Sequence, residues 1–302
     1  MVIPMTRRHA MALLAAVNRP PETRILLGGD VMLTRGVAQV AQAHQDPAYP
    51  FREIAALFSG ADIAFGNLES PFVEDGRPAR GSMVFRAAKE MIAGLEAAGI
   101  DVVSTANNHS RDAGPRGLEY TVSLLRQRGI AVAGTGLSFA EAHAGVILVR
   151  NNVRFGFLAY TFDANNGNYT DTEPRVAVTD IPQMRIDVMS LRQRADVVLV
   201  SMHAGWEYHK APNPQQKEFA KAAIDAGASV VVGHHPHVVQ PWERYGNGAI
   251  FYSLGNLVFD QSTPKETTQG QIAEVVFRGT TLLSAGVIPV EIAGSVPRRV
   301  SL

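Results

Sequence analysis

The chain has 302 residues, which fits one large domain or two small ones and can bury a substantial core. Its 28 Lys and Arg balance 28 Asp and Glu, which argues against a nucleic-acid partner because nucleic-acid-binding proteins carry a basic excess. It contains no cysteine, which excludes disulfides and thiolate metal sites, so any metal must be bound by nitrogen and oxygen atoms.

Residues 1–22 form a leader ahead of the first expected strand. Arg7 and Arg8 precede an apolar run, Ala10 to Val17, which resembles the charged and apolar regions of a secretory signal. The run is too short to cross a bilayer, which takes about 20 residues, and no A-x-A-like cleavage site follows it. Two interpretations stay open: an export signal on an extracytoplasmic or membrane-associated protein, and an inert leader on a cytoplasmic one.

Short apolar runs then alternate with helical patterns. The expected helices are Arg35–Ala43, Phe51–Phe58, Lys89–Ala98, Gly117–Arg128, Met184–Arg194 and Pro214–Ala226. The expected strands are the apolar runs that begin at Thr23, Ala61, Asp101, Ile130, Ala195, Ser229 and Ala249. Strands that alternate with helices predict βαβ units and a largely parallel sheet that is buried on both faces.

Two segments depart from this alternation. Asn151-Asn152 separates two β-rich runs and is typical of a two-residue hairpin turn, so an antiparallel element is expected there. The segment from Ile272 to Ala293 is also expected to form β hairpins.

Six of the expected strands end in polar residues that could carry out chemistry. In a parallel sheet the functional crevice lies beyond the carboxyl ends of the strands, so these residues are expected to meet in one place. They are Asp30, Asn67, Glu69, Asn107, Asn108, His109, His203, His234, His235, His237, Ser253 and Asn256.

This set offers the carboxylate, amide and imidazole ligands that suit Mn, Zn or Fe. A pair of ions about 3.5–4 Å apart would activate a bridging water. Taken singly, Asp30 and Asn108 also fit turn residues, and His109 fits a hydrogen-bonded structural histidine. Trp206 and Tyr208, beside His203 and Glu207, fit either a core or the wall of a pocket.

The segments GGDVMLTRG, GNLESPF, TANNHSRDAG, HAGWEY, GHHPHVVQPWE and YSLGNLVFD, in this order, resemble the bacterial capsule-synthesis CapA family, also called the PGA_cap or poly-γ-glutamate biosynthesis family. The resemblance runs from Arg24 to Asp260. It implies an α/β fold like that of the calcineurin-like metallophosphoesterases: a four-layer α/β/β/α sandwich with mixed sheets and an active site at the strand ends. It also implies that residues 23–302 form a single domain.

The resemblance further implies roles for individual residues. The implied metal ligands are Asp30, Glu69, Asn108, His203, His235 and His237, with His109 as the general acid. The residues expected to contact the substrate or support the ligands are Asn67, Asn107, His234, Trp206, Tyr208, Glu243 and Asn256.

Two positions depart from the phosphoesterase pattern. Met32 replaces a histidine ligand, and Asn67 replaces a bridging aspartate whose role Glu69 could take. A thioether is a poor ligand for a hard divalent ion. Three possibilities therefore stay open: one metal ion, a remodelled pair that uses Glu69, or none.

Three functional hypotheses follow. The first is a metal-dependent hydrolase acting on a phosphoester or a related capsule intermediate. The second is a non-hydrolytic component of a capsule machine that binds an anionic polymer or a membrane-bound synthesis partner. The third is a metal-free, epimerase-like acid/base enzyme acting on a peptide, in which Asp30 or Glu207 and a histidine transfer protons. A groove for a polyanion could be lined by Arg35, Arg77, Arg80 and Arg86. We expect each of these arginines instead to be a solvated surface residue.

Overall fold

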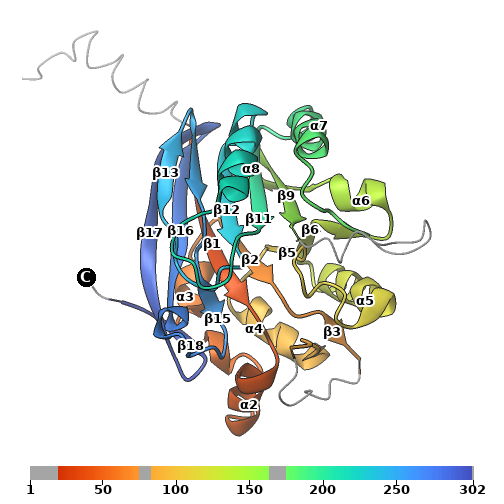
Figure 1. Cartoon of the computed structure of the whole chain (residues 1–302), viewed down its shortest axis with the longest axis vertical. Helices are drawn as coiled ribbons and strands as arrows, with labels where there is room; N and C mark the ends of the chain where they lie inside the picture. Colours follow the sequence, from red (N-terminus) through yellow and green to blue (C-terminus); the bar gives the residue numbers. More distant parts are fainter. Residues whose placement is uncertain (1–19, 75–82, 163–174, 301–302) are drawn as a thin grey trace, which may run out of the picture.

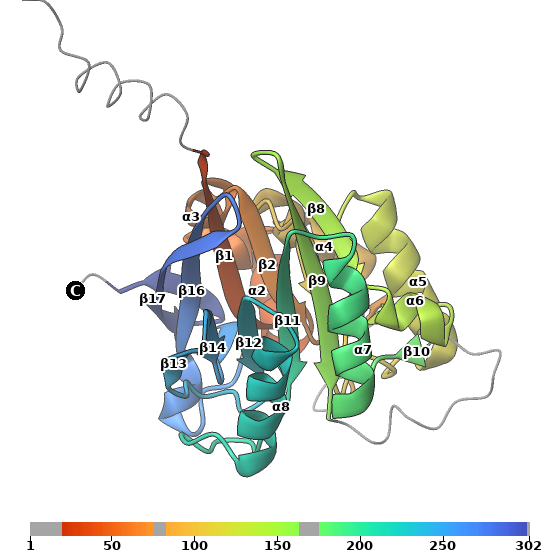
Figure 2. The same ribbon diagram turned by 90° about the horizontal axis from the view of Figure 1, so that it is seen from above.

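The computed structural model describes residues 20–74, 83–162 and 175–300. Over these residues the longer strands form two mixed sheets, which Figures 1 and 2 show stacked between helices. The predicted four-layer sandwich is therefore confirmed. The expected leader lies almost wholly outside the described residues, so the division at residue 22 stays a prediction.

The first sheet has a parallel centre and an antiparallel flank. β1 (Glu22–Val31) pairs in parallel with β2 (Ile63–Leu68) and β15 (Asn256–Val258), and the parallel order continues through β5 (Val102–Ser104) to β6 (Ala131–Ala133). On the other side of β1 run the antiparallel strands β16 (Gln269–Arg278), β17 (Thr281–Ala293) and β18 (Val296–Arg299). The β hairpins predicted for Ile272–Ala293 are thus confirmed.

The second sheet repeats this plan. β9 (Val153–Thr161), β11 (Val197–His203), β12 (Val230–His234) and β14 (Gly248–Phe251) are parallel. The antiparallel strands β8 (Val146–Arg150) and β13 (Trp242–Tyr245) form its edges. Short pairs join β3 (Phe72–Val73) to β4 (Ala87–Ala88) and β7 (Thr135–Gly136) to β10 (Arg175–Val176).

Helices cover the outer faces of both sheets. The helices are α2 (Arg35–Ala43), α3 (Ala55–Ser59), α4 (Ile92–Ala97), α5 (Gly114–Gln127), α6 (Phe139–His143), α7 (Ile181–Arg192) and α8 (Pro214–Asp225), with short 3₁₀ turns η1 (Tyr49–Phe51), η2 (Lys89–Met91) and η4 (Lys265–Thr268). Figure 2 shows α7 and α8 on one side of the sandwich and α3, α4 and α5 on the other.

The main core lies between the two sheets, where the ring centroids of Phe65 on β2 and Phe157 on β9 are 6.2 Å apart. A second core joins the outer face of the second sheet to α7 and α8, and includes Leu191 and Phe219. The parallel strands of both sheets are therefore buried on both faces, as expected for strands that read as continuous apolar runs, whereas the antiparallel strands β8, β13 and β17 are partly exposed.

The sequence pattern alone was wrong on four points. It started α5 at Gly117, whereas this helix begins at Gly114. It predicted one largely parallel sheet, whereas the parallel strands divide between two. It predicted a helix over Phe51–Phe58, where i→i+3 hydrogen bonds such as Ile54 to Phe51 give η1 and the shorter α3. It started α7 at Met184, although Asp180 caps a helix that begins three residues earlier. The hairpin at Asn151-Asn152 is confirmed, with both residues at positive φ.

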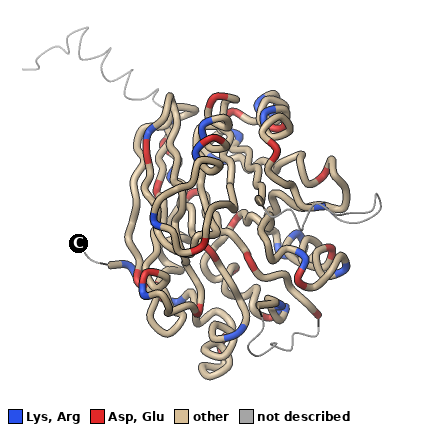
Figure 3. Tube along the Cα trace, in the orientation of Figure 1, with Lys and Arg blue, Asp and Glu red and all other residues tan. Residues whose placement is uncertain are grey.

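In the view of Figure 3, basic and acidic positions are interspersed along the described trace, and neither sign is confined to one region. Arg35 is not the solvated surface residue that we expected, because its side chain is only 19% exposed and its Nε donates to Oδ2 of Asp260 at 3.1 Å. Within residues 20–74, 83–162 and 175–300, no helix combines the length and apolar character needed to cross a bilayer.

Gly233 lets β12 approach the next strand closely, directly before the histidines. A Cβ at this position would lie 1.9 Å from the carbonyl oxygen of Tyr252. Gly233→Ala is therefore expected to lower the free energy of unfolding by about 3 kcal/mol, measured by urea denaturation. Gly286→Ala is the matched control, because its Cβ meets nothing within 4 Å, and should change stability by less than about 0.5 kcal/mol. Equal midpoints for the two variants would contradict this packing.

Candidate metal centre

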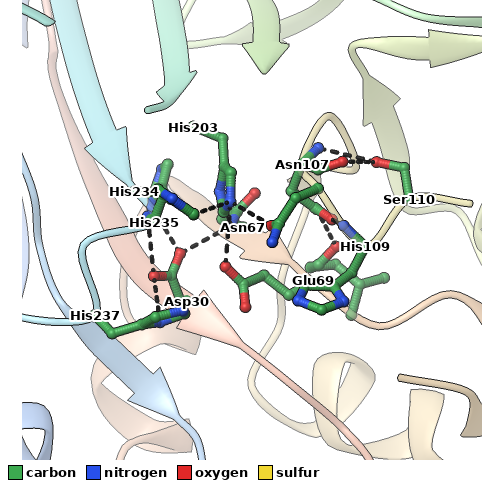
Figure 4. Close-up of polar contacts among 12 residues, drawn as sticks. Asp30, Asn67, Glu69, Asn107, His109, Ser110, His203, His234, His235 and His237 are labelled. Atoms are coloured by element: carbon green, nitrogen blue, oxygen red, sulfur yellow. Dashed lines mark hydrogen bonds and ion pairs between the residues drawn. The ribbon is translucent and has the colours of Figure 1, made fainter. Parts of the chain in front are cut away.

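Polar residues at the strand ends of both sheets meet at one edge of the sandwich (Figure 4). In the first sheet Asp30 on β1 is in register with Asn67 on β2, and in the second His203 on β11 is in register with His234 on β12. The backbone amide of His235 donates to Oδ2 of Asp30 at 3.2 Å, across 205 residues of sequence. The convergence predicted from the sequence therefore occurs, and it joins the two sheets.

The donor atoms around His203 are spaced like the ligands of one ion. Its Nε2 lies 2.9 Å from Oδ1 of Asn108, 3.1 Å from Nδ1 of His235 and 3.5 Å from Oε1 of Glu69. Ligands bound at about 2.0–2.2 Å around one ion are themselves about 3.0–3.4 Å apart. Asp30, Glu69 and His203 are all buried, and their donor atoms lie within 4.8 Å of one another.

Glu69 gives the clearest indication that a cation binds here. It is fully buried, and within the described residues neither of its carboxylate oxygens has a hydrogen-bond partner; the same holds for Oδ1 of Asn67. Buried acceptors without partners are costly. Burial and the charge of Asp30 raise the pKa of the Glu69 carboxyl well above its usual range. A divalent ion would satisfy both oxygens and reverse that shift, so the residues present fit such an ion.

Asp30 has the opposite environment. Burial disfavours its charge, but His234 and His237 outweigh burial and hold the pKa of Asp30 well below its usual range. Oδ1 of Asp30 lies 3.5 Å from Nδ1 of His234, an ion-pair separation longer than a hydrogen bond, and Oδ2 lies 3.3 Å from Nδ1 of His237. Asp30 is therefore a carboxylate available to bind a cation.

The loop after β12 directs its histidines by an unusual backbone. His235 and His237 have φ values of 95° and 58°, a left-handed region that is strained for residues other than glycine. Asn256 donates its amide to the carbonyl of Thr267 at 3.0 Å, so its oxygen faces His237 and accepts from Nδ1 at 2.9 Å. Nε2 of His237 is then the atom that would bind an ion, once the ion displaces the proton there. Burial opposes protonation of His237, but Glu69 and Asp30 raise its pKa to about 9.

Glu207 extends the site toward solvent. It follows β11, and its carboxylate lies with the imidazoles of His235 and His237 in a second group of donor atoms within 4.8 Å of one another. The sequence suggested Glu207 as an acid/base residue, and the structure places it among possible ligands. Trp206 and Tyr208 on either side are exposed, and the Tyr208 ring lies 6.5 Å from that of His237.

His109 stands beside these groups and is oriented by a residue that the sequence reasoning missed. Its Nδ1 donates to Oδ2 of Asp112 at 2.8 Å, and its ring stacks on Phe85 with centroids 3.9 Å apart. The signal for Asp112 was its position three residues after His109. Asn107 holds the same loop, because its Nδ2 donates to the carbonyl of Leu68 at 2.8 Å and its Oδ1 accepts from the backbone of His109.

The two departures from the phosphoesterase pattern have structural consequences. Met32 is fully buried in the core, and its sulfur accepts a hydrogen bond from the backbone of Thr34 at 3.2 Å. Asn67 donates from Nδ2 to Oδ1 of Asp30 at 2.8 Å and lies 3.2 Å from Nδ1 of His203. Met32 is therefore a core residue, whereas Asn67 remains within the cluster.

Glu243 is placed elsewhere. It lies on β13, and its carboxylate accepts a hydrogen bond from the hydroxyl of Tyr252 at 2.6 Å. Tyr252 belongs to the outer core of the second sheet, so Glu243 serves that packing rather than the donor cluster.

A model of the family described as bacterial capsule synthesis protein PGA_cap matches residues 24–261. The chain belongs to the PGA_cap family. The match includes every residue predicted as a metal ligand, so the donor cluster lies within the PGA_cap region.

Named relatives agree with this assignment. The chain is 32% identical over 284 residues to the capsule biosynthesis protein CapA of Bacillus anthracis, covering 90% of this chain and 68% of that protein. It is 32% identical over 237 residues to the PGA biosynthesis protein CapA of Bacillus subtilis, covering 77% and 62%.

Among solved structures, a Staphylococcus aureus chain provisionally assigned as a 5′-nucleotidase superposes with a TM-score of 0.56 at 11% identity, over 89% of this chain and 54% of that one. At this identity the likeness establishes the fold alone.

Proposed function

We propose that this chain is a metal-dependent hydrolase that acts on a phosphoester or a related intermediate of capsule or poly-γ-glutamate biosynthesis. The observation that carries the proposal is the buried Glu69 carboxylate, whose two oxygens accept no hydrogen bond from the described residues and lie among nitrogen and oxygen donors from both sheets. A purely structural cluster would pair such a carboxylate with donors.

The proposed ligands are Asp30, Glu69, Asn108, His203, His235 and His237. This set of carboxylate, amide and imidazole groups suits Mn, Zn or Fe. When bound, such an ion supplies a water of lowered pKa and polarises a phosphoryl oxygen. Glu207 is a further candidate ligand at the exposed side, where it lies with His235 and His237.

The remaining residues act on the substrate. His109, held in one orientation by Asp112 and Phe85, is placed to donate a proton to the leaving oxygen from Nε2. Asn256 fixes the tautomer of His237. Tyr208, exposed beside His237, and the neighbouring exposed Trp206 would form the wall that an incoming substrate contacts.

The cellular role that we propose follows the relatives. Both named Bacillus proteins are described as biosynthetic proteins of capsule or PGA. We infer a role at the cell envelope, with an anionic polymer or peptide as substrate and membrane capsule-synthesis proteins as partners.

Hydrolysis of bis(4-nitrophenyl) phosphate and 4-nitrophenyl phosphate tests the proposal. Chelation is expected to lower turnover by at least about 100-fold, and added Mn²⁺ or Zn²⁺ should restore it. His203→Ala should not be restored, whereas His44→Ala, an exposed histidine stacked on Tyr49, should behave as wild type. Metal-independent turnover would overturn the proposal. Folded, metal-loaded protein that hydrolyses neither ester would favour the non-hydrolytic binding role.

A further inference from the structure

The donor atoms at the strand ends fall into two groups that share no residue. Within each group the donor atoms lie within 4.8 Å of one another. The inner group is buried, whereas the outer group keeps part of its surface exposed. The inner group consists of Asp30, Glu69 and His203, and the outer group of Glu207, His235 and His237. Three protein ligands are enough to hold a catalytic zinc ion, so each group has the number that one ion needs.

Backbone contacts hold Glu207 in the outer group. The amide of Tyr208 donates to the carbonyl of Pro236 at 2.8 Å, which joins the loop that carries Glu207 to the loop that carries the two histidines. Gln240 anchors the same loop again, because its Nε2 donates to the carbonyl of His209 at 2.8 Å. The position of Glu207 beside the histidines therefore follows from a fixed backbone.

His235 lies between the two groups. Its Nδ1 is 3.1 Å from Nε2 of His203, yet a neutral imidazole has one free lone pair and can bind only one ion at a time. The inner group does not depend on it, since Oδ1 of Asn108 lies 2.9 Å from the same Nε2 of His203 and supplies a fourth donor. His235 is therefore available to the outer group.

His237 is directed to the outer group by its other contacts. Its Nδ1 faces Oδ1 of Asn256 at 2.9 Å and Oδ2 of Asp30 at 3.3 Å. Only Nε2 is left to bind an ion, and it is the ring nitrogen on the side away from these contacts.

The two groups differ in chemistry. With Asn108, the inner group offers two carboxylates, an amide oxygen and one imidazole, an oxygen-rich set that suits the harder ions. The outer group offers two imidazoles and one glutamate. This is the ligand set of catalytic zinc sites, in which a fourth position takes water.

We propose that the outer group binds a second ion, for which Glu207 is the charged ligand. The inner ion, and any part of the second ion in hydrolysis, rest on the proposed function. Glu207 thereby adds a ligand to a centre from which the buried Met32 withholds one. The outer ion is held more weakly than the inner one, because its group has one carboxylate instead of two and is partly exposed.

The test is the zinc stoichiometry of the full chain, freed of metal with a chelator and then dialysed against increasing free Zn²⁺. The wild type is expected to bind two equivalents, the second at least about 10-fold more weakly than the first. Glu207→Gln should keep the first equivalent and bind the second at least about 10-fold more weakly than the wild type, because an amide replaces the charged ligand. Glu218→Gln, at an exposed acid on α8, is the matched control and should bind both as the wild type does.

Each alternative outcome has a distinct meaning once melting temperatures show that the variants are folded. Saturation of the wild type at one equivalent would overturn the proposal. A second equivalent that Glu207→Gln binds as tightly as the wild type would be an adventitious ion only and would also overturn it. Loss of both equivalents in Glu207→Gln would place Glu207 in a single shared centre, against the division into two groups. Two equivalents that depend on Glu207, in a protein that hydrolyses neither nitrophenyl ester, would support the outer site and contradict the proposed hydrolase alone.

Discussion

His109→Asn is expected to lower kcat for phenyl phosphate by about 1,000-fold and for 4-nitrophenyl phosphate by only about 10-fold. A general acid contributes roughly 10²- to 10⁴-fold where the leaving group needs a proton. The 4-nitrophenolate ion is stable enough to leave without a proton, whereas the more basic phenyl leaving group needs one. The size of the loss in kcat should therefore depend on the leaving group. Steady-state kinetics with both esters measure this. Equal losses would show that His109 does not protonate the leaving oxygen.

Asp112→Asn provides the companion experiment, because Asp112 acts through His109 as a positioning residue. It should lower kcat by about 10-fold for phenyl phosphate with little change in KM, and the loss should again shrink for 4-nitrophenyl phosphate. Bound metal should stay at the wild-type level in both variants. A fall in metal content would instead assign the pair to the metal centre.

Local patterns in the sequence predicted much of the fold. The bounds predicted for α2 are those observed, and Gly99 and Gly129 follow α4 and α5 at positive φ, as helix-terminating glycines do. The division of the parallel strands into two sheets was not predictable in the same way. It depends on contacts between distant segments, such as that of Phe65 with Phe157, which leave no local signal.

The strand-end rule predicted which polar residues converge. It brought Asp30, Asn67 and His203 together although they are far apart in sequence, because parallel strands of adjoining sheets end at the same edge. Met32, which the sequence already marked as a poor ligand, follows β1 and is buried in the core.

Residues that orient others were missed. Asp112 has its role only through the hydrogen bond to His109, and Asp260 only through Arg35, 225 residues away. Neither lies at the end of an expected strand. Their function arises from contacts that the fold creates, so the sequence pattern could not separate them from surface acids.

Glu69→Gln is expected to weaken metal binding by at least about 100-fold, because the change removes a charged oxygen ligand and leaves the side-chain shape intact. The same change should not lower the stability of the metal-free protein, since neither oxygen of Glu69 has a hydrogen-bond partner among the described residues to lose. Thermal melting in the presence of a chelator measures the second effect. Glu274→Gln, at the ion pair with Arg24, is the control and should bind metal as wild type does.

The most direct measurement is the metal content of the full chain purified without chelator and then dialysed against Mn²⁺ or Zn²⁺. If Glu69 and its neighbours hold an ion, we expect about one equivalent of metal or more in the wild type and in Glu274→Gln. The metal content should fall strongly in Glu69→Gln and His203→Ala. Folded wild-type protein that retains less than about 0.1 equivalent of any transition metal, or Glu69→Gln that retains as much as the wild type, would contradict the assignment of this cluster as a metal centre.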